Sequence, residues 1–224
     1  MKNRYLMPSL DVTELGKAVS LAEAVAAHPF VSSFKLGFAL GLGAGLPNAV
    51  AAIRAFTSKP LVYDHQKAGT DIPDTGALFA RTMRAAGITE AILFPQAGPK
   101  TLEAWVKALQ DADVVPVVGA VMTHEGFRIS EGGYLDDAGL LGAYELAAKC
   151  GVRKFVVPLT KPGVAQAVSW PEDSIFYSPG FGAQGGDPHA FAALPEHHLI
   201  AGRAYIQAPD KLAYVHGVAT EYGQ

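Results

Sequence analysis

The most informative part of this chain is the passage from an apolar strand through a charged loop into a helix, in the segment Leu61-Val62-Tyr63-Asp64-His65-Gln66-Lys67-Ala68-Gly69-Thr70-Asp71-Ile72-Pro73-Asp74-Thr75. A short apolar run, typical of a buried strand, ends at Asp64, and a helical pattern begins at Thr75. Between them a lysine and a second acid follow within a few residues. Such crowding costs desolvation and like-charge repulsion, which proteins usually tolerate for chemistry rather than stability. The alternative is a solvated polar loop after a strand.

The same alternation of strand and helix recurs along the chain. The predicted strands are Tyr5–Leu10, Ser33–Gly37, Leu61–Asp64, Ala91–Phe94, Val114–Ala120, Lys154–Val157, Ser174–Tyr177 and Leu199–Ala201. The predicted helical segments are Glu14–Ala27, Asn48–Phe56, Thr75–Ala86, Lys100–Asp111, Ala138–Cys150, Val164–Ser169, a short stretch near Pro188–Ala193, and Pro209–Tyr222. Short, nearly continuous apolar strands indicate a parallel sheet covered on both faces. About eight such units predict an α/β fold, a closed (β/α)8 TIM barrel forming a single domain over residues 1–224.

Composition narrows the function classes. The net charge is −3 and no run of Lys or Arg occurs, which argues against a nucleic-acid or membrane partner. The single cysteine, Cys150, excludes an intramolecular disulfide and suits a reducing compartment. The apolar segment near the N-terminus is too short for a signal peptide, and glycines and Pro47 interrupt the weakly polar region Leu36–Ile53. We expect a soluble cytoplasmic protein.

Charged and polar residues stand at or beyond the ends of the predicted strands. In a TIM barrel the active site lies at the carboxyl ends of the strands, so these side chains are expected to converge on one rim. They are Asp11, Lys35, Asp64, Lys67, Asp71, Thr123, His124 and Arg203. A charge inside a strand, as at Lys35, is costly unless it is paired, and Asp64 on the next strand is the expected partner.

The ends of the last two strands predict an anion site. Glycines at 180, 182, 185 and 186 allow a close backbone approach, and Arg203 follows Gly202 directly after the final strand. An arginine fork suits a phosphate, and the loops after strands seven and eight commonly hold phosphate in this fold. The alternative is a flexible loop with a surface arginine. Residues 180–186 are also the candidate lid.

Taken together, these motifs resemble the orotidine 5′-monophosphate decarboxylase family over most of the chain. The likeness rests on Leu10-Asp11, Phe34-Lys35-Leu36-Gly37, Asp71-Ile72-Pro73-Asp74-Thr75, Met122-Thr123-His124, Ser178-Pro179-Gly180, Gln184-Gly185-Gly186 and Gly202-Arg203. The resemblance implies decarboxylation of orotidine 5′-monophosphate to uridine 5′-monophosphate in pyrimidine biosynthesis, with no cofactor and no metal. It also implies a homodimer.

The resemblance assigns roles to individual residues. The catalytic array would be Lys35, Asp64, Lys67 and Asp71, with Asp71 supplied by the partner subunit. Asp11 would contact the ribose or neighbouring array members, Thr123 the pyrimidine, Gln184 both base and phosphate, and Arg203 the phosphate. Ile72 and Thr75 would reach across the dimer interface with Asp71. Pro179, Gly185 and Gly202 complete the implied substrate-binding set.

One departure separates this chain from the family pattern Asp-x-Lys-x-x-Asp-Ile-Pro. Here the spacing is one residue longer on each side of Lys67. Residues two apart on a regular strand share a face and residues three apart do not, so Lys67 meets Asp64 only through a bulge or an early strand end. In a regular strand Gln66 would take the place of the lysine, and an amide cannot protonate carbon as an ammonium can. We favour the bulge because Asp-Ile-Pro-x-Thr is intact.

Two other functions remain open. A Mg²⁺-dependent sugar-phosphate decarboxylase or aldolase of the same superfamily would carry Glu where Lys35 stands, and a cation at that position repels a metal. A non-catalytic nucleotide-binding barrel is the other alternative, supported by the lengthened segment. The histidines lack close metal-ligand spacing and are interpreted as polar loop residues, with His65 the one expected to line the pocket. Trp105 is interpreted as helix packing and Trp170 as a loop anchor.

Overall fold

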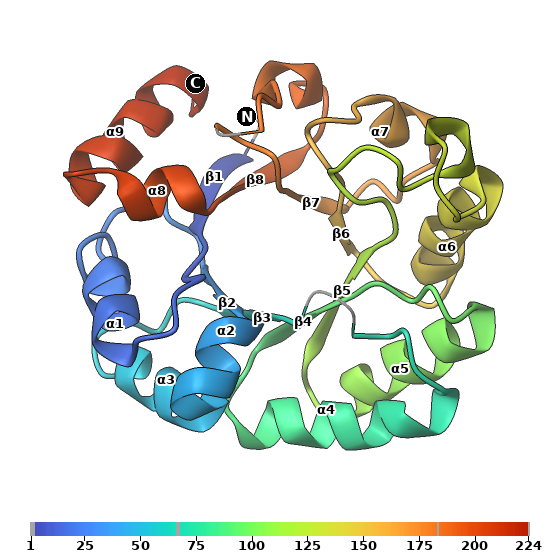
Figure 1. Cartoon of the computed structure of the whole chain (residues 1–224), viewed down its shortest axis with the longest axis horizontal. Helices are drawn as coiled ribbons and strands as arrows, with labels where there is room; N and C mark the ends of the chain where they lie inside the picture. The colour runs from blue at the N-terminus through green and yellow to red at the C-terminus, as the bar shows by residue number, and fades with distance from the viewer. Residues whose placement is uncertain (1–2, 66–67, 183, 224) are drawn as a thin grey trace.

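The computed structural model describes residues 3–65, 68–182 and 184–223, and it confirms the (β/α)8 barrel. Eight parallel strands surround a central axis and the helices form an outer ring (Figure 1). The strands are β1 (Asn3–Pro8), β2 (Phe34–Gly37), β3 (Leu61–Asp64), β4 (Glu90–Leu93), β5 (Val115–Gly119), β6 (Lys154–Val156), β7 (Ile175–Ser178) and β8 (Glu196–Ala201). The order is β1-β8-β7-β6-β5-β4-β3-β2. Between β1 and β2, isolated bridges pair Leu6 with Val31 and Ser9 with Lys35, so the barrel nearly closes.

Helices follow the strands on the outside of the barrel. They are α1 (Leu15–Glu23), α2 (Phe38–Leu40), α3 (Leu46–Arg54), α4 (Gly76–Ala85), α5 (Pro99–Asp111), α6 (Asp137–Lys149), α7 (Gly163–Ala167), α8 (Arg203–Gln207) and α9 (Lys211–Tyr222). The described residues also form one π-helical turn, η1 (Gly41–Gly45), and three 3₁₀ turns, η2 (Pro73–Thr75), η3 (Ile129–Glu131) and η4 (Pro188–Phe191). None of the described helices has both the length and the apolar character needed to cross a membrane.

Several element boundaries differ from the sequence prediction. The first strand ends at Pro8 rather than Leu10, and the stretch near Pro188 is a 3₁₀ turn. The sequence did not predict α2, η1 or α8. These are short elements whose glycines or brevity leave no clear helical period, and a π-turn has no pattern of its own.

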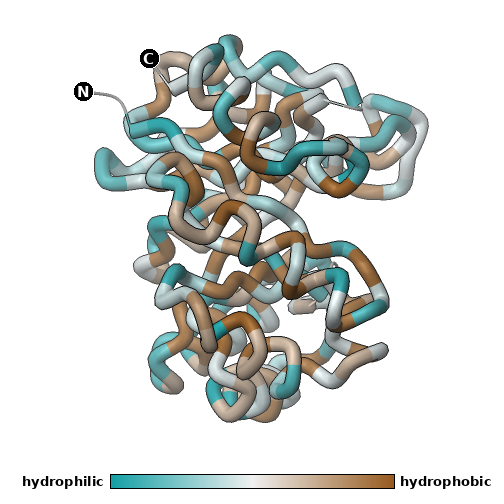
Figure 2. Tube along the Cα trace, turned by 90° about the vertical axis from the view of Figure 1, so that its left-hand side faces the viewer, coloured by the Kyte–Doolittle hydropathy of each residue, from teal (hydrophilic) through white to brown (hydrophobic). Residues whose placement is uncertain are grey.

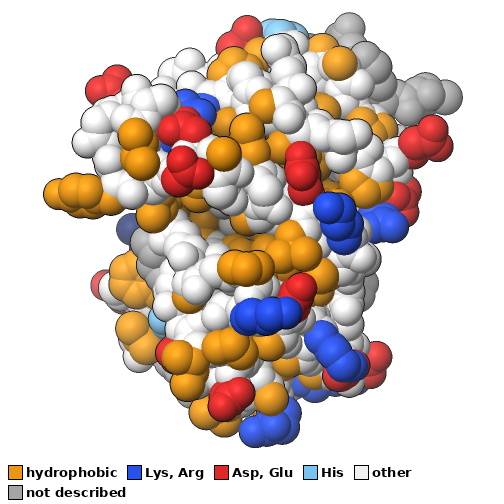
Figure 3. All heavy atoms as spheres, turned by 90° about the vertical axis from the view of Figure 1, so that its right-hand side faces the viewer, with side chains coloured by type: hydrophobic (Ala, Val, Ile, Leu, Met, Phe, Trp, Pro, Cys, Tyr) orange, Lys and Arg blue, Asp and Glu red, His pale blue; other side chains and the backbone are white. Residues whose placement is uncertain are grey.

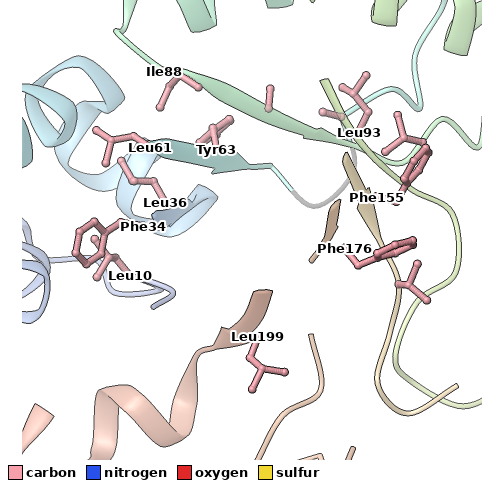
Figure 4. Packing of buried hydrophobic residues seen from close by; sticks show 14 of the residues in the cluster. Leu10, Phe34, Leu36, Leu61, Tyr63, Ile88, Leu93, Phe155, Phe176 and Leu199 are labelled. Atoms are coloured by element: carbon pink, nitrogen blue, oxygen red, sulfur yellow. The ribbon is translucent and has the colours of Figure 1, made fainter. Parts of the chain in front are cut away.

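Two apolar layers form the core. The layer inside the barrel consists of Met7, Val62, Ile92, Phe94, Val117, Val156, Tyr177 and Ile200. The alternate residues of each strand point outward and pack under the helices, as Leu36, Leu61, Tyr63, Phe155 and Phe176 do in Figure 4. The Cα trace in Figure 2 shows brown apolar segments through the middle of the molecule and teal polar segments at many loops.

The floor of the barrel is polar and internally paired. The Lys154 Nζ lies 2.7 Å from Glu90 Oε1, and the Tyr177 hydroxyl donates to Glu90 Oε2 over 2.8 Å. On the neighbouring strand His198 contacts Glu196 at 2.8 Å and Ser32 at 2.7 Å. Glu90 is only 3% exposed, so these hydrogen bonds and the ammonium offset its desolvation.

Candidate active site

A cavity of about 630 Å³ opens at the carboxyl ends of the strands. Among the residues predicted for the site, those that line it are Asp11, Lys35, Asp64, Thr123, Pro179, Gln184, Gly202 and Arg203. They come from six strand-to-helix connections or strand ends that are far apart in sequence. The barrel therefore brings these side chains together on one rim, as their positions at the ends of the predicted strands indicated.

Lys35 joins two carboxylates at the base of this cavity. Its ammonium lies 3.0 Å from Asp64 Oδ2 and 3.3 Å from Asp11 Oδ1. The Lys35 side chain is 5% exposed and that of Asp64 is 14% exposed, whereas Asp11 is 40% exposed. The predicted pairing of Lys35 with Asp64 is confirmed. Burial alone would lower the pKa of Lys35, but Asp64 and Asp11 outweigh it and the pKa is raised, so the ammonium stays charged.

Asp11 is held on three sides. The Ser9 hydroxyl donates to Asp11 Oδ2 over 2.7 Å, while Oδ1 faces Lys35. On the third side lies Gly37, where a Cβ would stand 2.2 Å from Asp11 Oδ1. Only a residue without a side chain leaves this space for the carboxylate. Ser9 is 1% exposed and was not identified from the sequence, although a serine within an apolar strand two residues before Asp11 was an available signal.

The loop after β7 folds back on itself. The N–H groups of Gly185 and Gly186 donate to Gly182 O and Gly180 O, at 2.9 and 3.0 Å. These two N–H groups are thus bonded within the loop, and Gly185 is absent from the residues lining the cavity, so the anion site predicted for these glycines stays a prediction. Phe181 and Gln184 do line it, together with Gln207 of α8, and Phe181 and Gln207 were not singled out from the sequence. Arg203 begins α8 beside them.

Thr123 lies on a loop that a charged cluster braces. The Thr160 hydroxyl donates to Thr123 O over 2.9 Å, and Lys161 Nζ donates to His124 O over 2.8 Å. Lys161 also lies 2.7 Å from Glu131. Although partial burial opposes it, hydrogen bonds from Lys161 and Arg128 lower the pKa of Glu131 to about 2. The loop that carries Thr123 is thus tied to the next strand-to-helix connection.

The Asp71-Ile72-Pro73 segment lies outside the cavity of its own chain. None of Asp71, Ile72 and Thr75 lines that cavity, and Ile72 is 59% exposed. Lys67 and Gln66 fall outside the described residues, so the bulge proposed for the lengthened segment stays a prediction.

Two interpretations of aromatic residues change with the structure. His65 does not line the cavity, because its Nδ1 lies 2.7 Å from the hydroxyl of Tyr63, whose side chain packs on the outer face of the strand. Trp105 does more than pack, since its indole N–H donates to Ile72 O over 3.0 Å. The expectation that Trp170 anchors a loop agrees with a 2.8 Å bond from its indole to Ala165 O.

A nearly closed (β/α)8 barrel with paired charges at the carboxyl ends of its strands is the architecture of a TIM-barrel enzyme. The chain belongs to the family described as "Orotidine 5'-phosphate decarboxylase / HUMPS family", whose model matches residues 4–217. It is similar to the orotidine 5′-phosphate decarboxylase of Pyrococcus furiosus, with 31% identity over 204 residues covering 89% of each chain. The corresponding protein of Thermoplasma volcanium is 28% identical over 206 residues, covering 92% of this chain and 87% of that one.

The fold is also that of solved structures. The orotidine 5′-monophosphate decarboxylase of Methanocaldococcus jannaschii, solved with the inhibitor BMP, superimposes with a TM-score of 0.84 at 22% identity. The match covers 99% of this chain and all of that one. A Pyrococcus horikoshii decarboxylase gives a TM-score of 0.79 over 98% of this chain. The resemblance stated from the motifs is therefore confirmed.

Proposed function

We propose that this protein decarboxylates orotidine 5′-monophosphate to uridine 5′-monophosphate in pyrimidine biosynthesis, without a cofactor. The observation that carries the proposal is the Asp11–Lys35–Asp64 array inside the cavity of a chain that belongs to this family. Loss of CO₂ leaves negative charge on a ring carbon, so the site must present a fixed cation where that charge develops. Lys67 is proposed as this cation and as the proton donor, with Asp64 and Asp71 flanking it.

The remaining cavity residues are proposed to bind substrate. Arg203, with the loop from Pro179 to Gln184, takes the phosphate, and Thr123 faces the pyrimidine. The Asp11 side chain lines the cavity and is 40% exposed, whereas that of Lys35 is 5% exposed, so Asp11 is proposed to accept a hydrogen bond from a ribose hydroxyl. Phosphate contacts distant from the reacting carbon raise turnover if they drive closure of this loop.

A homodimer is proposed because Asp71 belongs to a surface segment. Asp71 and Ile72 are exposed and lie outside the cavity of their own chain. Asp71 is therefore proposed to enter the active site of a partner subunit. Beside this segment a groove of about 360 Å³ lies between α5 and α6, lined by Pro99, Leu102, Leu140 and other residues. Figure 3, which views the side carrying α5 and α6, shows orange hydrophobic side chains gathered around this hollow. We propose that the two-fold interface covers it.

The Mg²⁺-dependent alternative is not favoured, because the Lys35 ammonium already bridges the two carboxylates that a metal would need. We also propose that the chain acts as one barrel domain and resides in the cytoplasm. The single eight-stranded sheet and the single cysteine support these two proposals.

The direct test is an ultraviolet assay of the purified protein with orotidine 5′-monophosphate, with and without a chelator. Activity that is insensitive to the chelator is expected. Nucleotide binding without release of CO₂ would instead indicate a binding protein. Lys67→Ala should abolish turnover while uridine 5′-monophosphate still binds, and near-normal turnover of this variant would refute the role of Lys67.

A further inference from the structure

The segment that begins at Asp71 is fastened to α5 through its backbone. The Thr101 hydroxyl donates to Asp71 O over 2.8 Å, and Trp105 Nε1 donates to Ile72 O over 3.0 Å. Both donors are buried, with Thr101 3% and Trp105 5% exposed, while the segment they hold lies at the surface. Two consecutive carbonyls are thus fixed by side chains one helical turn apart on the same face of α5.

The other side of Trp105 is fixed as well. At Gly76, the first residue of α4, a Cβ would stand 2.7 Å from Trp105 Cδ1, so the indole lies directly on the backbone. Phe79 packs against the indole with 5.1 Å between ring centroids. Both the start of α4 and the carbonyl of Ile72 therefore depend on the position of this ring.

We propose that Thr101 and Trp105 are positioning residues that set the location of Asp71, and that they act on the active site of the partner subunit. The inference rests on the proposed function, in which Asp71 crosses the interface. It explains how a segment lengthened between Asp64 and Asp71 keeps its acid in place. The far end is held by α5, whatever path the chain takes before it. Because a misplacement of about 1 Å can cost 100-fold in rate, such a clamp affects turnover directly.

Trp105→Phe removes the indole donor and keeps an aromatic ring, and Thr101→Val removes the hydroxyl at nearly constant volume. For each homodimer we expect kcat to fall about tenfold, with a smaller change in KM. Trp170→Phe is the matched control, because its indole also donates to a backbone carbonyl, Ala165 O, in a segment proposed to carry no catalytic group. Its kcat should stay within twofold of wild type.

The deciding experiment mixes subunits. A Trp105→Phe chain is paired, through distinct affinity tags, with a Lys67→Ala chain, whose own site is expected to be inactive but whose Asp71 is intact. The complete site then combines Lys67 of the first chain with Asp71 of the partner chain. We expect about half the wild-type kcat per mixed dimer. A mixed dimer no more active than the Trp105→Phe homodimer would show that Trp105 acts on its own chain.

The other outcomes are also distinct. Wild-type kcat in both homodimeric variants would overturn the inference while leaving the decarboxylase function intact. Should Trp105→Phe fail to fold, the same mixing with Thr101→Val decides the question. A wild-type protein that releases no CO₂ would refute the proposed function itself, and the inference with it.

Discussion

The ammonium of Lys35 lies 3.0 Å from the carboxylate of Asp64, on adjacent strands and almost out of contact with solvent. This pair links the stability of the barrel to its chemistry. Removing one member of a buried ion pair lowers the stability of the fold strongly, because the charge of the other member stays buried without that compensation. The same geometry that would orient a reacting substrate therefore stabilises the fold only while the array is complete.

Lys35→Met should lower the free energy of unfolding by about 3 kcal/mol, since it removes the buried ammonium that pairs with both Asp64 and Asp11. Lys35→Gln, which retains a hydrogen-bond donor, should lose less. The pKa of Lys35 is raised in the folded state. Its ion pairs therefore contribute fully to the free energy of unfolding below the unfolded pKa of 10.5, and this contribution is lost only as the pH rises through the higher folded pKa. Urea unfolding of the three proteins between pH 7 and 10 should therefore show a constant difference. A difference that shrinks by pH 9 would contradict the raised pKa.

Gly37→Ala should displace Asp11 and reduce kcat/KM at least tenfold, because the new Cβ would meet the Asp11 carboxylate at 2.2 Å. Gly217→Ala in α9 serves as the control, since apart from the neighbouring backbone of its own helix no heavy atom lies within 4 Å of the new Cβ. That control should raise the unfolding free energy by about 0.5–1 kcal/mol and leave activity unchanged. Equal kinetics for the Gly37→Ala variant and wild type would show that Asp11 has another stable position.

Arg203→Ala should weaken substrate binding by about 2–4 kcal/mol, the scale expected for truncating a charged partner of a bound anion. Calorimetric titration with uridine 5′-monophosphate measures the change, and uridine without phosphate provides the comparison. The variant should bind uridine 5′-monophosphate more weakly than wild type does and should bind uridine equally well. If both ligands weaken equally, Arg203 does not contact phosphate.

His197 should make the protein sensitive to acid. Its ring is buried against Phe191 and Tyr222, and burial, followed by the charge of Arg4, lowers its pKa to about 3. The unfolded chain takes up a proton near pH 6.5 and the folded chain does not, so stability falls as the pH drops from 6.5 toward 3. In His197→Asn this dependence of the unfolding free energy on pH should be weaker than in wild type. Urea unfolding at several pH values in this range measures it, and parallel profiles for wild type and His197→Asn would exclude the effect.

Much of the architecture was predictable because strand and helix periods are local properties of the chain. Leu61–Asp64 was placed with both ends correct, and the pairing of Lys35 with Asp64 followed from the cost of an unpaired charge in a strand. What the sequence could not supply were relationships set by tertiary packing. The hydroxyl of Tyr63 draws His65 away from the cavity, and the indole of Trp105 reaches Ile72 across 33 positions. Neither contact has a periodic signature.

The paired charges of Glu90 and Lys154 beneath the apolar layer of the barrel have a consequence for the order of catalytic events. Because the interior is filled from the floor up to Val62, Ile92 and Val156, carbon dioxide formed beside Asp64 in the proposed reaction would have to leave through the mouth by which the nucleotide enters. If the 180–186 loop closes over the nucleotide as proposed, departure of carbon dioxide and opening of this loop would be consecutive events on one route.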